Sequence, residues 1–435
     1  MSREREETSP IDSNEENGRV AGRRRLVGDL NVGPVEVVEP QDADYSYVPP
    51  LSDDLALMIL ARVPLWEQRK LCFVNNRYLG LLRSDELYKI RREIGAKETL
   101  VFFLSSGESH WWVVNPRTSR SRILPVLRSD LCFEAGDKES LCVGSHLLVS
   151  GREYQGLVIW RYELAMNRWI KGPSMINPRC LFASANCENF ACVAGGVVNG
   201  SPDVSNFAEK YDPESKSWEQ LPGMIRCRKL CSGCYMDTKF YVIGGVDEQG
   251  KDLTCGEFYD VEKNTWVLVP DMIKEAPSAF SRSPPLIAVA NNQLYSLDPL
   301  TNQLQVYLKE SNSWKVLGDA PVKVNMGWGV AFKSLGDELL VIGAAEHSPT
   351  GHARMMMFRC CPDAGANHLQ WQYVETNGNY TSAFIFNCSV MQETWSIYWE
   401  MITCLAFLIN IFIACGVSPK RIEDKDDDNN EDGGD

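Results

Sequence analysis

Residues 240–266 read FYVIGGVDEQGKDLTCGEFYDVEKNTW, and this stretch decides the fold. It begins with an apolar run that ends in two glycines, and it closes with a tyrosine followed seven residues later by a tryptophan. An apolar run that ends in glycine is typical of a buried strand and a tight turn. The tyrosine–tryptophan spacing occurs four times, at Tyr162 and Trp169, Tyr211 and Trp218, Tyr259 and Trp266, and Tyr307 and Trp314.

The interval between these pairs is almost constant, since successive tryptophans are 49, 48 and 48 residues apart. A period near 50 indicates a ring of small sheets, because each repeat buries its apolar face only against its neighbours. We expect the paired tyrosine and tryptophan to lie on facing strands and to fill the gap between adjacent sheets. Their predicted role is therefore structural.

Double glycines mark the same repeats, at Gly195 and Gly196 and at Gly244 and Gly245. They are predicted to turn with positive φ and to leave bare backbone against which a neighbouring tryptophan lies. Six repeats of four strands span 99–391. The first repeat, 99–127, is one strand short, and the run 382–390 is expected to supply that strand and close the ring.

Residues 50–95 change to a helical pattern. Asp53 and Asp54 predict a capped helix start with an acidic first turn. Apolar residues at helical spacing then predict one helix before Pro64, a second from Leu71 to Leu82, and a third over 84–94. A unit of this size buries little surface and is marginal alone, so it gains stability by packing on a partner.

The two patterns together resemble one known family. The double glycine followed by tyrosine, six residues and tryptophan is similar to the kelch repeat, and the leucine pattern after Pro50 is similar to an F-box. Together they resemble the plant F-box/kelch-repeat family. This resemblance implies a mainly β fold, with a six-bladed kelch-type β-propeller over 99–391 preceded by a small three-helix F-box domain over 50–95.

The resemblance also implies a function. An F-box docks on a Skp-type adaptor that sits on a cullin, and the propeller serves as the substrate receptor of an SCF-type ubiquitin ligase, with no catalytic residue of its own. The implied adaptor-binding residues are Leu51, Leu55, Ile59, Leu60, Val63, Pro64, Leu71, Val74, Tyr78 and Leu81. Two alternatives stay open: the helices cap the propeller, or the protein is a kelch interaction scaffold unconnected to ubiquitin.

Loops that join one repeat to the next lie on one face of such a ring. They are expected at 177–179, 225–229, 274–285 and 322–328. A group of basic residues with one aromatic residue suits an acidic or phosphorylated target. The candidate substrate-binding residues are Arg179, Arg226, Arg228, Lys229 and Trp328. In the alternative interpretation, Arg179 and Arg228 are internal repeat residues that pair with neighbouring carboxylates.

Enzymatic chemistry has little support in the sequence. Some kelch propellers are copper-radical oxidases, but such a site needs several histidines and tyrosines that converge. Of the five histidines, His347, His352 and His368 belong to one stretch in the sixth repeat, and His110 and His146 belong to the first two repeats. We therefore expect no cofactor, no metal and no catalytic site. The fifteen cysteines show no disulfide framework, which indicates reduced thiols and a location in the cytoplasm or nucleus.

The termini carry most of the formal net charge of −14. Residues 1–50 hold 6 basic and 11 acidic side chains, and 418–435 hold 3 and 8, so the rest of the chain lacks the basic surface that nucleic acid requires. Residues 1–48 are predicted to be disordered. The tail, 392–435, includes an uncharged apolar stretch at 401–417. That stretch is either a short membrane anchor or an atypical terminus without such a role.

Overall fold

The computed structural model describes residues 47–48, 51–84, 86–95, 98–127, 139–154, 156–187, 189–201, 203–273, 283–324, 327–345, 354–362, 369–376, 378, 380 and 382–392. These residues belong to one compact unit, Ser46–Asp435. The predicted disordered region, apart from Tyr47 and Val48, and the apolar and acidic parts of the tail lie outside the described residues. No helix in the described part is long and apolar enough to span a membrane.

The N-terminal helices are α1 (Asp53–Ala61), α2 (Leu65–Gln68), the 3-10 helix η1 (Arg69–Phe73), α3 (Asn76–Arg83) and α4 (Glu86–Glu93). The continuous helix predicted from Leu71 to Leu82 is wrong. The side chain of Asn75 accepts a hydrogen bond of 3.0 Å from the backbone N–H of Tyr78 and starts a new helix. Asparagine prefers this capping position, because its side chain satisfies a backbone donor that the first turn leaves unpaired.

Six antiparallel sheets of four main strands follow. From the centre outwards, the first sheet has β27 (Ile385–Gln392), β1 (Thr99–Ser105), β2 (Trp112–Asn115) and β3 (Arg120–Ile123), and the second has β4 (Glu139–Val143), β5 (His146–Glu153), β6 (Gly156–Glu163) and β7 (Arg168–Lys171). The third has β9 (Ala183–Asn186), β10 (Ala191–Ala194), β12 (Ala208–Asp212) and β13 (Ser217–Leu221), and the fourth has β14 (Ser232–Met236), β15 (Lys239–Ile243), β16 (Gly256–Asp260) and β17 (Thr265–Val269). The fifth has β18 (Leu286–Ala290), β19 (Gln293–Asp298), β20 (Gln303–Leu308) and β21 (Ser313–Asp319), and the sixth has β23 (Ala331–Leu335), β24 (Glu338–Ala345), β25 (Met355–Cys360) and β26 (Gln372–Tyr373). Short strands β8 (Arg179–Cys180), β11 (Val197–Val198) and β22 (Val322–Lys323) extend the loops.

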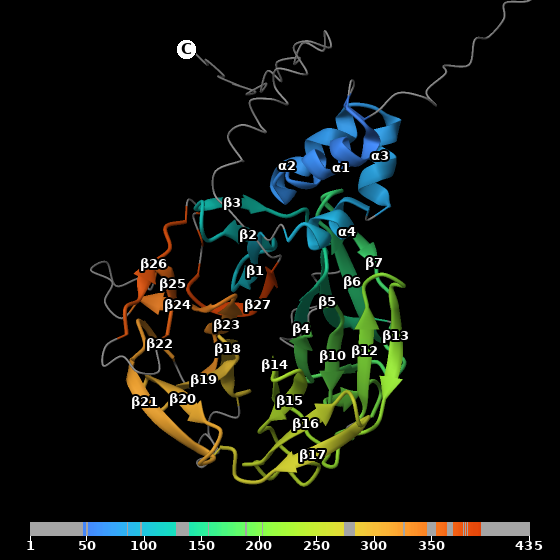
Figure 1. The fold of residues 1–435 in the computed structure, drawn as a ribbon. Helices are drawn as coiled ribbons and strands as arrows, with labels where there is room; N and C mark the ends of the chain where they lie inside the picture. Colours follow the sequence, from blue (N-terminus) through green and yellow to red (C-terminus); the bar gives the residue numbers. More distant parts are fainter. Residues whose placement is uncertain are drawn as a thin grey trace, which may run out of the picture. The chain divides into compact units, whose positions relative to one another are not determined.

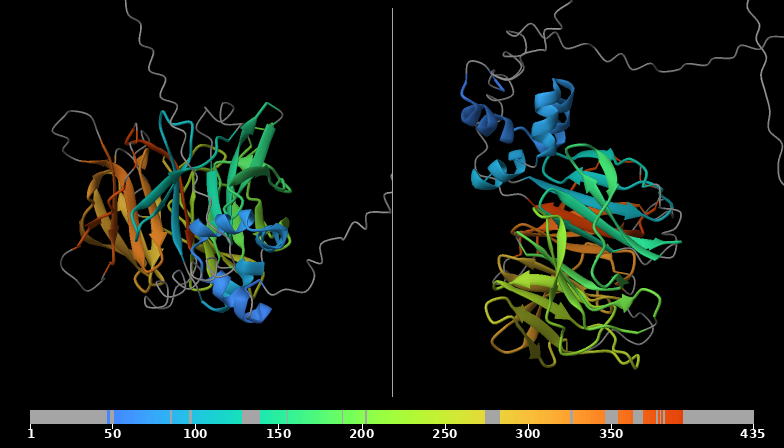
Figure 2. Two further views of the ribbon diagram at one scale, coloured as in Figure 1. Left: turned by 90° about the horizontal axis from the view of Figure 1, so that it is seen from above. Right: turned by 90° about the vertical axis from the view of Figure 1, so that its right-hand side faces the viewer.

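The sheets form a closed ring, a six-bladed β-propeller (Figure 1 and Figure 2). The innermost strands contact one another in the order β4, β9, β14, β18, β23, β27 and back to β4. Strand β27 pairs with β1 from Thr99 opposite Gln392 to Phe103 opposite Cys388. The prediction that the end of the repeat region completes the first blade is therefore confirmed, and this pairing leaves β1 with no open edge.

Each tyrosine–tryptophan pair occupies directly opposite positions on the two outer strands of its blade. The ring centroids lie 5.1, 5.1, 5.6 and 5.2 Å apart in chain order. The indole N–H of Trp266 also donates to the carbonyl of Pro222 at 2.7 Å, and that of Trp218 to Pro173 at 3.0 Å. These carbonyls follow the last strand of the preceding blade, so each tryptophan links two blades, as predicted.

The double glycines have positive φ, from 65° at Gly244 to 99° at Gly196. However, the atoms nearest to a side chain at these positions belong to Arg228, Cys180, Pro285 and Lys229 and not to a tryptophan, so that part of the prediction is wrong. A Cβ on Gly195 would lie 2.5 Å from the carbonyl oxygen of Arg228, and one on Gly245 would lie 2.6 Å from that of Lys229. The bare backbone is needed because the loop that joins these two blades passes directly over both glycines.

Candidate functional site

The predicted adaptor-binding residues divide into two groups in the structure. Leu60, Leu71, Tyr78 and Leu81 are buried together in the core of the N-terminal helices, and Val63 is also buried. Leu51, Ile59 and Pro64 are partly buried. Only Leu55 and Val74 are exposed. The buried residues therefore hold the helices together, and the exposed ones are available to a partner.

Two further exposed apolar residues were missed by the sequence reasoning. Met58 in α1 is exposed, and Phe73 at the end of η1 is 75% exposed. Both fall outside the apolar stripes that predicted the helices, and this placement off the buried face was the available signal. We call Leu55, Met58, Phe73 and Val74 the exposed apolar set. Four large apolar side chains left in water on so small a unit are typical of an interaction surface.

The candidate substrate-binding residues Arg179 and Arg228 are fully buried, so their assignment to a target-binding surface is wrong. Arg228 Nη2 lies 2.5 Å from Glu257 Oε1, and its Nη1 donates to the carbonyls of Gly244 and Cys255. The alternative interpretation, in which both arginines are internal repeat residues, is correct. Nε of Arg228 has no hydrogen-bond partner among the described residues, but the whole side chain is excluded from solvent and therefore cannot reach a ligand on the loop surface.

The same arrangement recurs one blade earlier. Arg179 pairs with Glu209, and Glu209 also accepts the backbone N–H groups of Ile176 and Asn177. Burial lowers the pKa of Arg179, and the carboxylate of Glu209 opposes that effect. In the next blade, Glu257 accepts the N–H groups of Ile225 and Arg226 in the same way. Glu209 and Glu257, which occupy equivalent positions in their blades, therefore hold the loops between blades by accepting backbone hydrogen bonds.

These fixed loops present other side chains to solvent. Arg226 and Trp328 are exposed, and Lys229 is partly buried. Ile176 and Ile225 are 51% and 56% exposed, although each directly follows a buried methionine, Met175 or Met224. The sequence reasoning missed the two isoleucines, and the signal was a Met-Ile dipeptide repeated at the blade interval. We call Ile176, Ile225, Arg226, Lys229 and Trp328 the loop face.

The structure describes only part of the other loops predicted to bind a target. Residues 274–282 and 325–326 of those loops lie outside the described residues. Among the residues that the structure describes, neither Arg226 nor Lys229 has an ion-pair partner. The loop face therefore joins rigidly held apolar side chains to cations that can pair with an acidic group.

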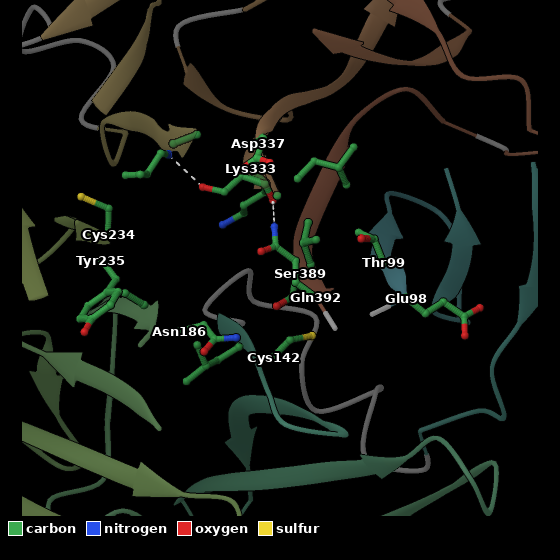
Figure 3. A pocket seen from close by; sticks show the side chains of 18 of the residues that line it. Glu98, Thr99, Cys142, Asn186, Cys234, Tyr235, Lys333, Asp337, Ser389 and Gln392 are labelled. Carbon is green, nitrogen blue, oxygen red and sulfur yellow. Dashed lines mark hydrogen bonds between the residues drawn. The ribbon is translucent and has the colours of Figure 1, made fainter. Parts of the chain in front are cut away.

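A hollow lies along the ring axis, enclosed by the innermost strands (Figure 3). It has a volume of about 1250 Å³ and is lined by all six innermost strands. Burial raises the pKa of Cys142 and of Cys234, which line it, to about 12, so both are neutral thiols at physiological pH. Across the described ranges, no group of three or more histidine, cysteine or acidic side chains is arranged to hold a metal ion.

Comparison with known proteins agrees with this architecture. The Kelch motif matches residues 227–273. The F-box/kelch-repeat protein At3g27150 of Arabidopsis thaliana is 50% identical over 363 residues, which cover 81% of this chain and 86% of the relative. The F-box/kelch-repeat protein SKIP11 of the same plant is 36% identical, over 80% of this chain and 75% of its own. The chain therefore belongs to the F-box/kelch-repeat protein family.

Proposed function

We propose that this protein is the substrate-recognition adaptor of an SCF-type cullin E3 ubiquitin ligase. The F-box helices bind a Skp-type adaptor, and the propeller binds the protein that is to be ubiquitinated. The observation that carries the proposal is the exposed apolar set, on the helices that precede the propeller of a family whose name includes the F-box. In this proposal, ubiquitin transfer is catalysed by the other subunits, and the protein works in the cytoplasm or nucleus.

The exposed apolar set supports adaptor binding in energetic terms. Fully burying a leucine or phenylalanine side chain contributes about 1.5 to 3 kcal/mol. Phe73, which is 75% exposed, therefore has most of that free energy still available to a partner. The salt bridge between Arg77 and Asp53, at 2.7 Å, ties α3 to the start of α1 beside Leu55. The helices are thus held in place before the partner arrives, which reduces the entropy cost of binding.

The loop face supports target binding on the other domain. Its two isoleucines supply apolar anchors, and Arg226 and Lys229 supply positive charge. A target segment that carries an apolar side chain next to acidic or phosphorylated residues would satisfy both. The backbone of Ile225 is hydrogen-bonded to Glu257 at 2.7 Å, so the anchor is fixed rather than mobile.

A pull-down with a purified Skp-type adaptor tests the proposal. The variant Leu55→Arg with Val74→Arg removes two exposed apolar contacts and should reduce adaptor binding about a hundredfold or more, because each charge would be buried unpaired. Leu300→Arg is the matched control, since Leu300 is also exposed but lies in the propeller. Unaltered circular dichroism must accompany each variant.

The alternative function is one outcome of this test. If the wild-type protein does not bind the adaptor, it is a kelch scaffold unconnected to ubiquitin. Target capture needs a separate measurement: affinity purification from cells in which the proteasome is inhibited, comparing the wild type with Ile225→Arg. Loss of the co-purified target with retained adaptor binding supports the loop face, whereas unchanged recovery excludes it.

A further inference from the structure

The channel along the ring axis carries a charge that the proposed function does not use. Its lining includes four cations, Arg92, Arg117, Arg120 and Lys333, and two acids, Glu98 and Asp337. Four cations against two acids give the lining a formal excess of positive charge. A cavity with an excess of one sign of charge raises the local concentration of the opposite ion.

Most of the charged lining residues are already neutralised. Glu98 accepts the N–H of Leu65 at 2.8 Å and lies 3.7 Å from Arg91. Arg92 pairs with Glu214, and Arg120 pairs with Glu67, each at 3.2 Å. These groups belong to the contacts of the N-terminal helices. They leave Lys333 as the cation that lies on an innermost strand.

Lys333 lies on β23, and its side chain has no hydrogen bond or ion pair among the residues that the structure describes. Its charge lowers the pKa of Cys142, which lines the channel, and of Cys388, which is buried beside it in β27, although burial raises both to about 12. Neutral thiols do not balance an ammonium. Asp337 lies four residues further on, in the turn after β23, and forms no ion pair with it.

Polar and apolar groups from several innermost strands line the same channel as Lys333. Ser389 lies on β27, the neighbour of β23 in the ring, and Asn186 lies on β9, on the opposite side of the channel. Ala185 and Val289 give apolar walls. Figure 3 shows Lys333, Ser389 and Asn186 around the same hollow. Ligand pockets combine apolar walls and a few convergent polar groups in this way.

We propose that the channel binds a small organic anion, whose carboxylate or phosphate group pairs with the ammonium of Lys333. The walls of the channel have a lower dielectric constant than water, which strengthens such a pair relative to one on the surface. The site is independent of the loop face and of the exposed apolar set. Its occupant is a small molecule, because the full channel has a volume of only about 1250 Å³.

Equilibrium dialysis of the full-length protein tests this site, with radiolabelled inorganic phosphate in one arm and radiolabelled citrate in the other. The wild type should bind at least one of them at a single saturable site, and the two arms distinguish phosphate from carboxylate. Lys333→Met should weaken binding about tenfold or more, because it removes the charge-assisted hydrogen bond. Lys333→Arg keeps the charge and should retain binding within about threefold of the wild type.

Lys263→Met is the matched control, since Lys263 is exposed in the turn between β16 and β17 and lies outside the channel lining. It should bind like the wild type. The proposal is overturned if neither anion binds saturably below about 10 mM, which corresponds to a negligible affinity. It is equally overturned if Lys333→Met binds as tightly as the wild type while its thermal unfolding is unchanged.

Discussion

The guanidinium of Arg228 lies 2.5 Å from the carboxylate of Glu257, and both side chains are completely excluded from solvent. Removing one partner of a buried pair leaves an uncompensated charge, so Arg228→Met should lower the free energy of unfolding by about 3 kcal/mol. Urea unfolding measures this loss. Arg226→Met, two residues away on the exposed loop face, should change it by less than about 0.5 kcal/mol. Equal effects from the two variants would contradict the burial of Arg228.

Because Arg228 is paired with Glu257, charge reversal at Arg228 is not a valid test of target binding. Charge reversal at Arg228 would place a second carboxylate beside Glu257, and the blade itself would be destabilised. Loss of target capture by that variant would then report unfolding and not recognition. Ile225 and Arg226 are the appropriate positions, because their side chains reach solvent while only their backbone contacts Glu257.

Gly245 and Gly250 offer a matched comparison within one blade. Both have positive φ, 92° and 79°. A Cβ added at Gly245 would lie 2.6 Å from the carbonyl oxygen of Lys229, whereas one added at Gly250 would meet nothing within 4 Å. Gly250→Ala should cost about 1 to 2 kcal/mol, the usual penalty for this backbone conformation. Gly245→Ala should cost about 3 kcal/mol or more, because the loop must also move. Thermal unfolding of both variants decides the comparison.

Trp266 joins two blades through a polar contact as well as through packing. Trp266→Phe keeps an aromatic ring against Tyr259 but removes the donor to Pro222, which lies at 2.7 Å. Leaving that carbonyl unpaired should cost about 1 to 2 kcal/mol, measured by urea unfolding. Trp328→Phe, at an exposed position, is the control and should be close to neutral. A neutral Trp266→Phe would show that packing alone links the blades.

Asp237 links two blades through Lys309 at 2.7 Å and Asn292 at 2.5 Å. Burial favours the neutral acid, but the hydrogen bonds from Lys309 and Asn292 outweigh it, so the pKa of Asp237 lies below its ordinary value. A pKa that is lower in the folded state stabilises the protein above the unfolded value, near 4, and this contribution is lost as pH falls through the folded value.

Asp237→Asn should therefore be less stable than the wild type at pH 7, and the difference should shrink as pH falls below about 4. Since both partners are about a third exposed, solvent screening limits the difference to about 0.5 kcal/mol. Asparagine tolerates the positive φ of 52° at this position, so backbone strain does not enter. Thermal unfolding across this pH range measures the effect. The stability of the Lys309→Met variant should likewise approach that of the wild type as pH falls over the same interval.

Long-range periodicity made most of the ring predictable. The seven-residue spacing in sequence between Tyr259 and Trp266 predicts a two-stranded hairpin. When that hairpin recurs at a constant interval, few arrangements of the sheets bury every sheet face. The contribution of residues 382–390 to the first blade followed from the same count, since one repeat lacked a strand. These predictions depend on spacing, which the sequence states directly.

The candidate sites were less predictable, because they depend on what each side chain faces. Arg226 and Arg228 are two residues apart, yet one reaches solvent and the other pairs with a carboxylate from a strand that follows about 30 residues later. Asn75 interrupted a helix because a local cap competed successfully with the apolar pattern. Phe73 was missed because it lies off the apolar stripe, and only residues on the stripe were taken as adaptor contacts.

The pairing of β27 with β1 means that the first blade is also the last to be finished. While the chain is being synthesised, β1 emerges early but must wait for Ile385–Gln392 before its inner edge is covered. A contact between such distant segments is slow to form, and the incomplete ring exposes an unpaired edge on the ribosome. A nascent chain that stops short of β27 is therefore open to aggregation, however well its other five blades have folded.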